Sequence, residues 1–592
     1  MDLNNLTKQI EDLRQQLDTL EADLSENQNA FFLCSMALII FLMQCGFAFL
    51  EAGAVRSKNT TNILIKNLLD SCIAIVGYWS LGWAFAFGTS NNEVIGLFVG
   101  HTEFFLSGMT NYPKFFFQYV FAATSATIVS GAVAERCEFF NYVTYCTVIS
   151  TFVYPILTHW GWNPEGWMFK GITSGSINTT YVDFAGAGVV HLCGGTISFA
   201  AAYIIGPRIG RFPKDGEEQS IEIKGHSVPF AALGGFILMF GFLAFNGGSM
   251  ADIVKAGEGE IVALAMINTM LSGAFAALTY LLIHYIFNGK WTLLLTINAC
   301  LAGMVSSCAG CNNMEPWASS FTGIGAGLIY LGLSKLMISW KVDDPLDAFA
   351  VHAGGGFWGL FSTCIISKNG IVYTVYDAAA GLPNKHLVGQ AFAQLGWQMV
   401  CALAIMTWSL LWMVPIFLLL RKIGKLRVPE EVEINGLDIY KHGEAAYPLH
   451  AYGHGWDEFE AVRVAPTENN SIEHRRKSMM PNQEISLEQL AAAYDRRTSI
   501  APVGFGSPVP GPRKKSLYIN PKLYEHPEHH HKAKDRSQHM KNVIIEEDET
   551  SEEVQETLQL QKKTPESRSA GKSNPAFDMY DDKPSVQTWQ KL

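Results

Sequence analysis

The sequence predicts an all-α polytopic membrane protein with eleven transmembrane helices. Three observations lead to this fold class: a succession of long apolar runs, an alternation of cation-rich and cation-poor loops, and an internal repeat that relates two five-helix halves. Of the 592 residues, 49% are hydrophobic and only 16% are charged, with most of the charge toward the two ends. The net charge of −11 therefore arises largely in the tails and carries no information about a substrate.

The apolar runs give the number and type of the elements. A helix needs roughly 20 apolar residues to cross a bilayer, and a backbone exposed to lipid must satisfy its own hydrogen bonds, which excludes open strands. The first run follows a polar segment and lacks a basic start, so it is not a removable signal peptide. Eleven runs have the required length, beginning near Phe31, Leu68, Phe115, Phe139, Phe184, Val228, Ile261, Trp291, Trp317, Ala348 and Gln390.

The loop cations give the orientation. Lys and Arg gather in cytosolic loops of membrane proteins. Here they gather in odd-numbered loops and after the last helix, at Arg56, Lys58, Lys66, Arg136, Arg208, Arg211, Lys214, Lys224, Lys335, Lys341, Arg421, Lys422, Lys425 and Arg427. Lys368 and Lys385 in the tenth loop are exceptions. The pattern predicts an N-terminus outside and a C-terminus in the cytosol, which agrees with an odd helix count.

Residues 1–29 form a separate extracellular element. Its leucines and one isoleucine alternate spacings of three and four, which is the a/d seam of a heptad repeat: Leu3, Leu6, Ile10, Leu13, Leu17, Leu20 and Leu24. Such a seam requires partner strands, and trimers are among the oligomers that it allows. The alternative is a single amphipathic helix on the membrane surface.

The last part of the chain, residues 451–592, is charged and rich in Ser, Pro and Gln, and we expect a mostly disordered cytosolic tail. Residues 475–478 and 496–499 resemble sites for basophilic kinases, because a phosphate there would sit beside arginines. The histidine tract at 529–531 is interpreted as a solvated polar segment. Cys308 and Cys311 lack a second cysteine pair, so their spacing does not predict a metal site. No cofactor and no nucleic-acid partner are predicted.

The internal repeat is the most informative feature. Asp183 and His191 are separated by seven residues, as are Asp344 and His352, and in each copy two glycines follow the histidine after two further residues. The first copy opens the fifth helix and the second opens the tenth, which enter the membrane from opposite sides. Two inverted five-helix halves related by a pseudo-twofold axis follow, and each supplies one histidine at middle depth. The glycines permit close helix approach.

A histidine within a membrane helix is costly and indicates function. The alternatives are a packing role and a metal site, since imidazole also suits zinc, copper or iron. Two histidines without nearby carboxylates or thiolates are an incomplete ligand set, and no His-x-x-His box is present. A membrane enzyme is therefore a poor fit.

Several spaced motifs resemble those of the ammonium transporter (Amt) family, over roughly residues 30–450. They are Asp183-Phe-Ala-Gly through His191 to Ile205-Gly-Pro-Arg208, Ala134-Glu-Arg136, Phe245-Asn-Gly-Gly-Ser249, Val342-Asp-Asp-Pro345, Leu426-Arg-Val-Pro-Glu-Glu431, and Gly436-Leu-Asp438 through His442-Gly-Glu444. The resemblance implies a membrane domain at 30–421, a structured cytosolic segment at 422–450, and a homotrimer with one pore in each subunit.

The resemblance also assigns site residues, one position at a time. The outer ammonium-binding site falls on Trp162, Phe121 and Ser249, with Phe117 lining the vestibule; the stacked gate falls on Phe121 and Phe245, the pore pair on His191 and His352, and the structural acid on Asp183. Trp160 and Trp167 lie in the same loop as Trp162 and compete for its role. A family tryptophan is Phe242 here, and a pore-mouth threonine is replaced by Cys308.

The resemblance implies a transporter for ammonium or methylammonium, and the long tail with its kinase-like sites favours a eukaryotic plasma membrane. Ammonium would bind outside by cation–π contact, lose its proton near the gate, and cross as ammonia, with or without the proton, along the histidines. We expect Asp183 to cap the fifth helix, or to stabilise the outer cation at a distance. Asn5 and Asn178 begin glycosylation sequons on the outer side. The competing interpretations are a Rhesus-like gas channel and an ammonium sensor that signals through its tail.

Overall fold

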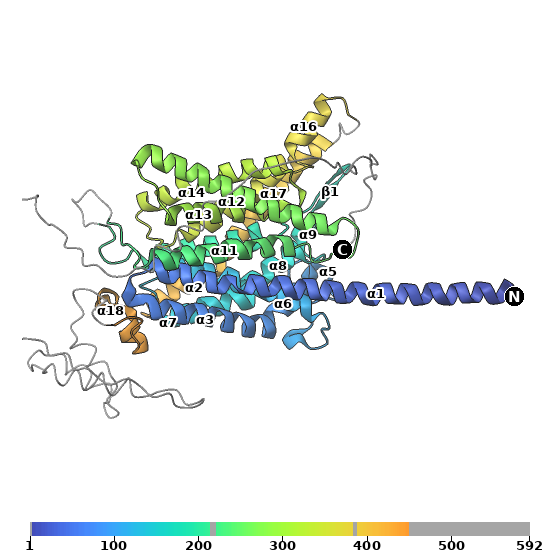
Figure 1. The fold of residues 1–592 in the computed structure, drawn as a ribbon. Helices are drawn as coiled ribbons and strands as arrows, with labels where there is room; N and C mark the ends of the chain where they lie inside the picture. Colours follow the sequence, from blue (N-terminus) through green and yellow to red (C-terminus); the bar gives the residue numbers. More distant parts are fainter. Residues whose placement is uncertain (1–2, 213–220, 383–386, 449–592) are drawn as a thin grey trace, which may run out of the picture. The chain divides into compact units, whose positions relative to one another are not determined.

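The structure is a computed structural model that describes residues 3–212, 221–382 and 387–448 (Figure 1). All of them belong to one compact unit, residues 1–482. The tail predicted at 451–592, with its kinase-like sites and histidine tract, lies outside the described residues.

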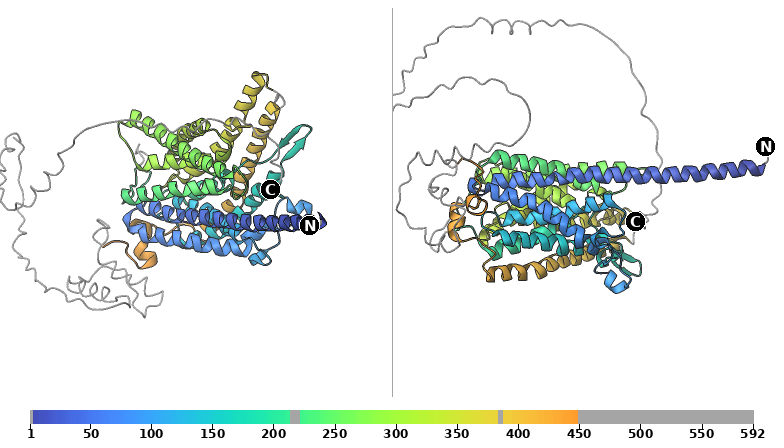
Figure 2. Two further views of the ribbon diagram at one scale, coloured as in Figure 1. Left: turned by 45° about the vertical axis from the view of Figure 1, so that its right-hand side comes forward. Right: turned by 90° about the horizontal axis from the view of Figure 1, so that it is seen from below.

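The described residues fold mainly as helices that lie side by side in both views of Figure 2. Those of the first half are α1 (Leu3–Phe41), α2 (Met43–Ala54), η1 (Ser57–Asn59), α3 (Thr60–Gly77), η2 (Tyr78–Gly82), α4 (Trp83–Phe87), α5 (Glu93–Gly96), η3 (Phe104–Leu106), α6 (Tyr112–Ala132), α7 (Phe139–Val148), η4 (Ile149–Val153), α8 (Tyr154–Trp162), α9 (Trp167–Lys170), η5 (Ala187–Leu192) and α10 (Cys193–Ile205).

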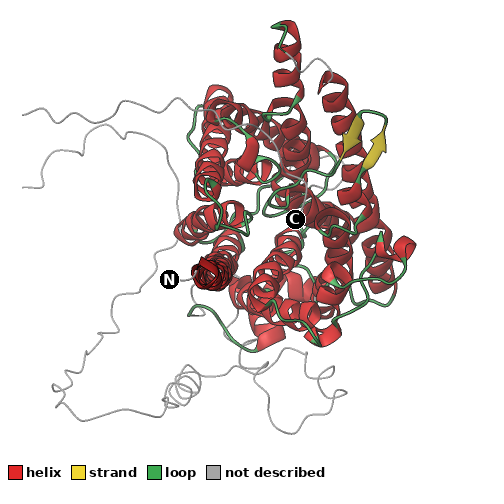
Figure 3. Ribbon diagram, turned by 90° about the vertical axis from the view of Figure 1, so that its right-hand side faces the viewer, coloured by secondary structure: helices red, strands yellow, loops and turns green. Residues whose placement is uncertain are grey.

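The second half contributes α11 (Val228–Gly248), α12 (Glu258–Asn288), α13 (Leu294–Ser307), η6 (Cys311–Asn313), α14 (Pro316–Ser339), η7 (Phe349–Gly354), α15 (Gly355–Ile366), α16 (Ile371–Ala379) and α17 (Leu387–Lys422). Two short elements, α18 (Glu430–Asn435) and η8 (Asp438–His442), follow the last long helix. A small antiparallel hairpin, β1 (Ile172–Ser174) and β2 (Ile177–Thr179), lies against α17 (Figure 3).

Ten of the eleven predicted runs form helices that are long and apolar enough to cross a membrane. The run near Trp291 forms only α13, which has 14 residues and therefore a length of about 21 Å. It packs against α12 and α14. The all-α polytopic membrane fold is confirmed, whereas the count of eleven and the orientation stay predictions.

Local chemistry explains where two of the long helices begin. Asn111 precedes α6, and its Oδ1 accepts a hydrogen bond from the backbone N–H of Lys114 at 3.1 Å. Ser227 caps α11 in the same way, through the backbone N–H of Phe230. Each helix also has a proline in its first turn, where the missing N–H breaks no helical hydrogen bond.

The two copies of the repeat fold alike and cross one another closely. Each histidine lies in a π-helical turn, η5 or η7, that continues into an α-helix, α10 or α15. A Cβ on Gly195 would lie 2.2 Å from the Ala353 nitrogen, and a Cβ on Gly356 would lie 2.3 Å from the Ala187 oxygen. Only glycine permits this reciprocal approach, in which the π-helical turn of each copy packs on the helix that follows the other.

The heptad segment is not separated from the first span by a break. Helix α1 runs unbroken from Leu3 to Phe41, a length of about 58 Å (Figure 1). Within the part whose side chains are described, the seam residues are exposed: Ile10, Leu13, Leu17, Leu20 and Leu24.

The segment after α17 packs against the helix ends that carry the loop arginines. We call this end of the molecule the arginine face, and its residues are Arg56, Arg136, Arg208 and Arg427. Asp438 accepts a hydrogen bond from the backbone N–H of Asn62 at 2.9 Å, and Asn59 accepts one from the N–H of Leu437 at 3.0 Å. Lys441 bonds to Glu138 at 2.8 Å. The described part of residues 422–450 therefore contacts the ends of these helices, and its role as a separate cytosolic segment stays a prediction.

Candidate functional site

Four aromatic rings form a cluster at the end of the helices opposite the arginine face. Phe121 of α6 and Phe245 of α11 are parallel within 26°, with ring centroids 4.1 Å apart, and both are almost fully buried. The Trp162 ring meets Phe121 edge-on at 5.9 Å, and the Phe117 ring lies 4.9 Å from Phe121. The two residues predicted as a stacked gate are thus in face-to-face contact.

Trp162 is the tryptophan of its loop that contacts this stack. Its indole N–H donates to the backbone oxygen of Asp183 at 2.7 Å, which fixes the ring beside the start of the fifth span. Trp160 instead donates to the oxygen of Phe98 and packs against Trp167 and Trp408. The geometry therefore favours Trp162 over its two neighbours for the role that the sequence left open.

Ser249 lies one helical turn beyond Phe245, at the end of α11. Its hydroxyl donates to the backbone oxygen of Phe245 at 2.8 Å. This bond uses the only proton of the hydroxyl, so both of its lone pairs remain available to accept hydrogen bonds. Ser249 is half-buried, as a residue at the edge of an entrance would be.

Below the gate the two histidines are directly coupled. Nδ1 of His191 and Nδ1 of His352 are 3.2 Å apart, and the rings are within 13° of parallel. His191 also packs on Phe245 at 5.4 Å and on Phe242 at 5.6 Å. The position where the family tryptophan is missing is therefore filled by a phenylalanine that covers His191.

The histidine contact fixes the roles of the ring nitrogens. Two neutral imidazoles that share one Nδ1–H···Nδ1 bond must be opposite tautomers. One then presents an accepting Nε2 and the other an Nε2–H donor. In a 1,3-diazole ring the Nε2 atoms face away from this shared bond, so the pair can accept a hydrogen bond at one ring and donate one at the other.

The Asp183 side chain caps the start of η5 by accepting several backbone hydrogen bonds. Oδ1 accepts from the N–H groups of Gly186 and Ala187 at 2.9 and 2.7 Å, and Oδ2 accepts from Gly188 and Val189 at 2.9 and 3.1 Å. The Tyr181 hydroxyl donates to Oδ2 as well, at 3.1 Å. One carboxylate thus satisfies four backbone donors at the start of the π-helical turn that carries His191.

Cys308 contributes to the same region through its backbone. Its oxygen accepts from the N–H of Ala185 at 2.8 Å, and its thiol is fully buried. Among the described residues, no group of three or more His, Cys, Asp or Glu side chains is placed to hold a metal ion.

On the other side of the histidine pair there is a small cavity that the sequence did not predict. It has a volume of about 30 Å³ and is lined by His352, Phe47, Asn298 and Glu51, together with aliphatic side chains. Glu51 is 1% exposed and lies in an otherwise uncharged run of α2. The sequence does show Glu51 as a lone carboxylate in a membrane helix, which indicates a functional residue. It does not show that this side of α2 is turned toward the histidine pair, because that depends on packing.

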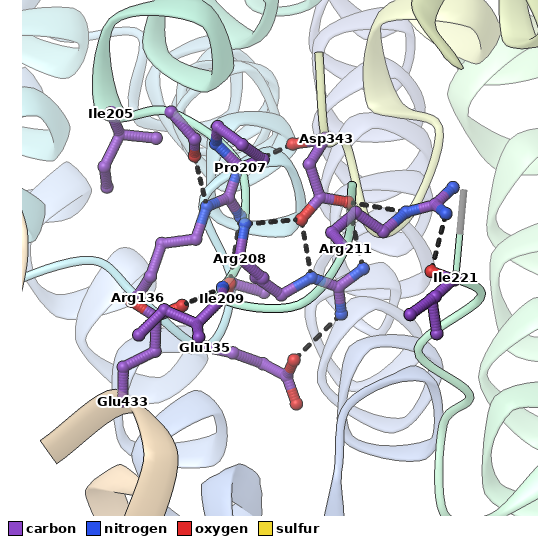
Figure 4. A network of polar contacts seen from close by, with 12 residues as sticks. Glu135, Arg136, Ile205, Pro207, Arg208, Ile209, Arg211, Ile221, Asp343 and Glu433 are labelled. Atoms are coloured by element: carbon purple, nitrogen blue, oxygen red, sulfur yellow. Dashed lines mark hydrogen bonds and ion pairs between the residues drawn. The ribbon is translucent and has the colours of Figure 1, made fainter. Parts of the chain in front are cut away.

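The arginine face carries a buried network of ion pairs (Figure 4). Arg208 binds Asp343 at 2.7 Å and Glu135 at 2.8 Å, and Arg56 binds Glu135 at 3.0 Å. Burial alone would raise the pKa of Glu135, but Arg208 and Arg56 lower it to about 2. Arg208 and Arg136 likewise hold the pKa of Asp343 at about 2 against the effect of burial.

The model of the Ammonium Transporter Family matches residues 30–447 of the chain. The chain belongs to the ammonium transporter family. It is 68% identical over 505 residues to a putative ammonium transporter 1 of Caenorhabditis elegans, covering 84% of this chain and 94% of the relative. It is 36% identical to ammonium transporter 1 member 3 of Solanum lycopersicum, covering 72% and 94%.

Solved structures agree with this family assignment. A protein described as a sensor Amt protein superposes with a TM-score of 0.62 at 32% identity, covering 71% of this chain and 100% of that protein. Mep2 of Saccharomyces cerevisiae superposes with a TM-score of 0.57 at 24% identity, covering 68% and 88%, and shows the same fold. As a member of the ammonium transporter family, the chain is a multi-pass membrane transporter and not an enzyme, and its family supports ammonium transport.

Proposed function

We propose that this transporter binds ammonium at Trp162, Phe121 and Ser249, removes its proton at the phenylalanine gate, and passes ammonia along His191 and His352. The observation that carries the proposal is a continuous contact chain. The rings of Trp162, Phe121, Phe245, His191 and His352 follow one another with centroid separations of 5.9, 4.1, 5.4 and 5.2 Å.

The entrance suits a cation that can donate hydrogen bonds. An ammonium ion on an aromatic face gains about 0.5–2 kcal/mol, and more when it is desolvated. Phe117, Phe121 and Trp162 offer such faces, and Ser249 can accept one ammonium N–H because its own proton is already used. Potassium gains the same attraction, but it neither donates hydrogen bonds nor has a proton to release, so it cannot cross the buried gate as a neutral species.

The gate converts this selection into transport of a neutral species. Carrying a bare cation through a buried phenylalanine stack is expensive, and burial of an amine favours its neutral form. Ammonia resembles water in its hydrogen bonding, and the histidine pair offers it one acceptor and one donor. Asp183 supports this geometry by holding the turn of His191.

We place the aromatic entrance outside and the arginine face in the cytosol of a plasma membrane. The arginines of the odd-numbered loops support this orientation. It puts Asn178, which is exposed in β2, on the outer side, where its sequon suits glycosylation.

The subunits assemble as a homotrimer through the face of α1 that carries the leucine seam. Ile10, Leu17, Leu24, Phe31 and Leu38 follow at intervals of seven residues, and all five are exposed. The seam outside the membrane thus continues in one register into the span, opposite the buried side of α1. A single interface with copies of the same helix would cover both parts.

The trimer is tested by replacing Leu13, Leu17 and Leu20 together with Ser. The expected result is a loss of trimers on cross-linking, or a lower dissociation temperature, without loss of the helical fold. The matched control replaces Glu11, Asp18 and Glu21, on the same helix, with Gln. Equal trimer stability in both variants would contradict a role for the seam.

The transport proposal is tested in oocytes by clamping the voltage and recording cytosolic pH while ammonium, potassium and sodium are added in turn. We expect a saturable response to ammonium and none to the two metal ions. A pH change without current identifies a channel for ammonia alone, the Rhesus-like alternative. Silence in both, with the protein at the surface, contradicts transport.

A sensor is the second candidate, favoured by the name of the sensor Amt protein that shares the fold. Truncation after Tyr447 separates the two functions. A transporter keeps ammonium flux without its tail, whereas a protein that mainly signals shows little flux before and after truncation.

A further inference from the structure

Glu51 is a buried carboxylate that the proposed transport route does not use. It is three residues from the end of α2 and 1% exposed, within a run of apolar and small residues. Keeping an acid there is costly in a membrane protein unless it has a task. Packing alone therefore does not explain a glutamate at this position.

The cavity gives Glu51 direct access to the histidine pair. Glu51 and His352 line the same 30 Å³ space, which is large enough for about one or two water molecules. His352 uses Nδ1 for its bond to His191, so Nε2 is the nitrogen left to interact with the cavity. A proton on this Nε2 can reach the carboxylate through water.

The contacts of Glu51 suit a group that accepts protons. Its two oxygens accept from the Ser130 hydroxyl and from the Asn67 amide, the latter at 2.8 Å. The Asn67 amide stabilises the ionised carboxylate, whereas burial favours the neutral acid. The Ser130 hydroxyl is also placed to donate to the Thr127 oxygen at 2.8 Å, so it can accept a hydrogen bond from Glu51 once the acid is neutral. The charged side chains that act on it are Asp70 and Lys66, which lie one turn apart on α3.

Asp70 adds a second buried acid beside this site. It is fully buried beside the Tyr142, Cys146 and Thr127 side chains. Lys66 donates to the backbone oxygen of Cys137 at 3.3 Å, toward the arginine face. Asp70 and Lys66 therefore extend the line of polar groups from Glu51 toward the arginine face. Arg56 of that face is only five residues after Glu51 in the chain.

We infer that Glu51 accepts the proton that ammonium leaves at the histidine pair and passes it to the arginine face. This inference rests on the proposed function. As ammonium reaches the gate, one of its N–H bonds breaks and the proton goes to Nε2 of His191, whose ring packs on the gate residue Phe245. The Nδ1 proton of His191 moves to Nδ1 of His352, and the Nε2 proton of His352 moves through water to the Glu51 carboxylate. The products are ammonia, a neutral Glu51, and a histidine pair with exchanged tautomers.

The histidine pair resets without a further reactant. The ammonia molecule, as it passes, accepts the Nε2 proton of His191 and donates one of its own to Nε2 of His352, while the Nδ1 proton returns. Glu51 releases its proton toward the arginine face. Each cycle thus moves one ammonia and one proton, so one charge crosses.

The test compares the wild type with Glu51→Gln in oocytes, recording current and cytosolic pH on addition of ammonium. The variant is expected to fold, because Oδ1 of Asn67 has no partner among the described residues and can accept from the new amide after a flip. We expect at least a tenfold smaller current. We also expect alkalinisation of the cytosol, since ammonia alone enters and binds a proton there.

Two further variants make the test specific. Glu51→Asp keeps a carboxylate and should restore part of the current. Glu315→Gln makes the same chemical change at an exposed glutamate paired with Lys368, and should behave as the wild type. Surface biotinylation measures the amount of each protein.

Wild-type current and pH response in Glu51→Gln would overturn the inference, as would a surface-localised variant that passes neither ammonia nor charge. A wild type that alkalinises the cytosol without current overturns the proton route but leaves ammonia transport intact. A wild type that moves neither species overturns the proposed function itself.

Discussion

The two copies of the Asp-x7-His repeat share a local fold but differ in their surroundings. Asp183 satisfies four backbone donors with both of its oxygens, whereas Asp344 uses one oxygen, which accepts from Phe349 at 2.8 Å, and its other oxygen has no partner among the described residues. His191 is enclosed by Phe242 and Phe245, while His352 faces a cavity that contains a carboxylate. The repeated part positions the pair, and the unrepeated neighbours give the route two chemically different ends.

Asp183→Ala and Asp344→Ala test the difference between the caps, and the first should have the largest effect of all. Removing Asp183 leaves four backbone N–H groups without an acceptor, at about 1.5–3 kcal/mol for each hydrogen bond to a charged group. We expect almost no folded protein by size-exclusion chromatography in detergent. Asp344→Ala should fold and melt only several degrees lower. Equal stability of the two variants would show that the copies are energetically equivalent.

His191→Ala and His352→Ala test whether the pair acts as a unit. We expect each to lower methylammonium uptake or ammonium selectivity at least tenfold, because either change removes the shared Nδ1 bond and one of the two Nε2 groups. The trimer should still assemble, which cross-linking measures. Full wild-type selectivity and flux in both variants would refute the pore assignment.

Trp162→Leu tests the aromatic end alone. Loss of a cation–π contact of about 0.5–2 kcal/mol should raise the apparent KM for ammonium roughly 2- to 30-fold, with little change in maximal current. Trp162→Phe is the matched control, since it keeps an aromatic face and should give a smaller rise. A fall in maximal current at unchanged KM would instead indicate that Trp162 only supports Asp183.

The ion pairs beside the second copy are expected to have the smallest effect on transport, because they lie outside the proposed route, and their effect is on stability. Because the pKa of Glu135 is lowered from 4.5 to about 2, its stabilising contribution is complete above pH 4.5 and is lost as the pH falls toward 2. The amount is on the order of 3 kcal/mol. Acid unfolding of Glu135→Gln, followed by tryptophan fluorescence, should be less steep over this range. An unchanged profile would contradict the ion-pair assignment.

Much of this arrangement could be predicted from sequence because it depends on local spacing. The runs beginning near Phe139 and Val228 start helices at those residues. The glycines after each histidine predicted the close crossing. The symmetry of the repeat placed one histidine of each half at middle depth, and the structure brings His191 and His352 together there.

Other features depend on packing that no local pattern encodes. The choice among Trp160, Trp162 and Trp167 depends on how one loop folds over Asp183. Glu51 and His352 line the same cavity only because α2 is turned to that side. The bonds from Arg208 to Glu135 and Asp343 join three distant loops, and the run near Trp291 forms a helix shorter than its apolar length suggested.

The unbroken course of α1 ties two surfaces to one helical phase. Each residue turns an α-helix by 100°, so inserting one residue between Glu26 and Asn29 would rotate the leucine seam by that angle away from Phe31 and Leu38. Inserting seven residues would leave an offset of only about 20°. The number of residues between the leucine seam and the membrane span is therefore constrained as well as their composition, because it sets the direction in which the seam faces.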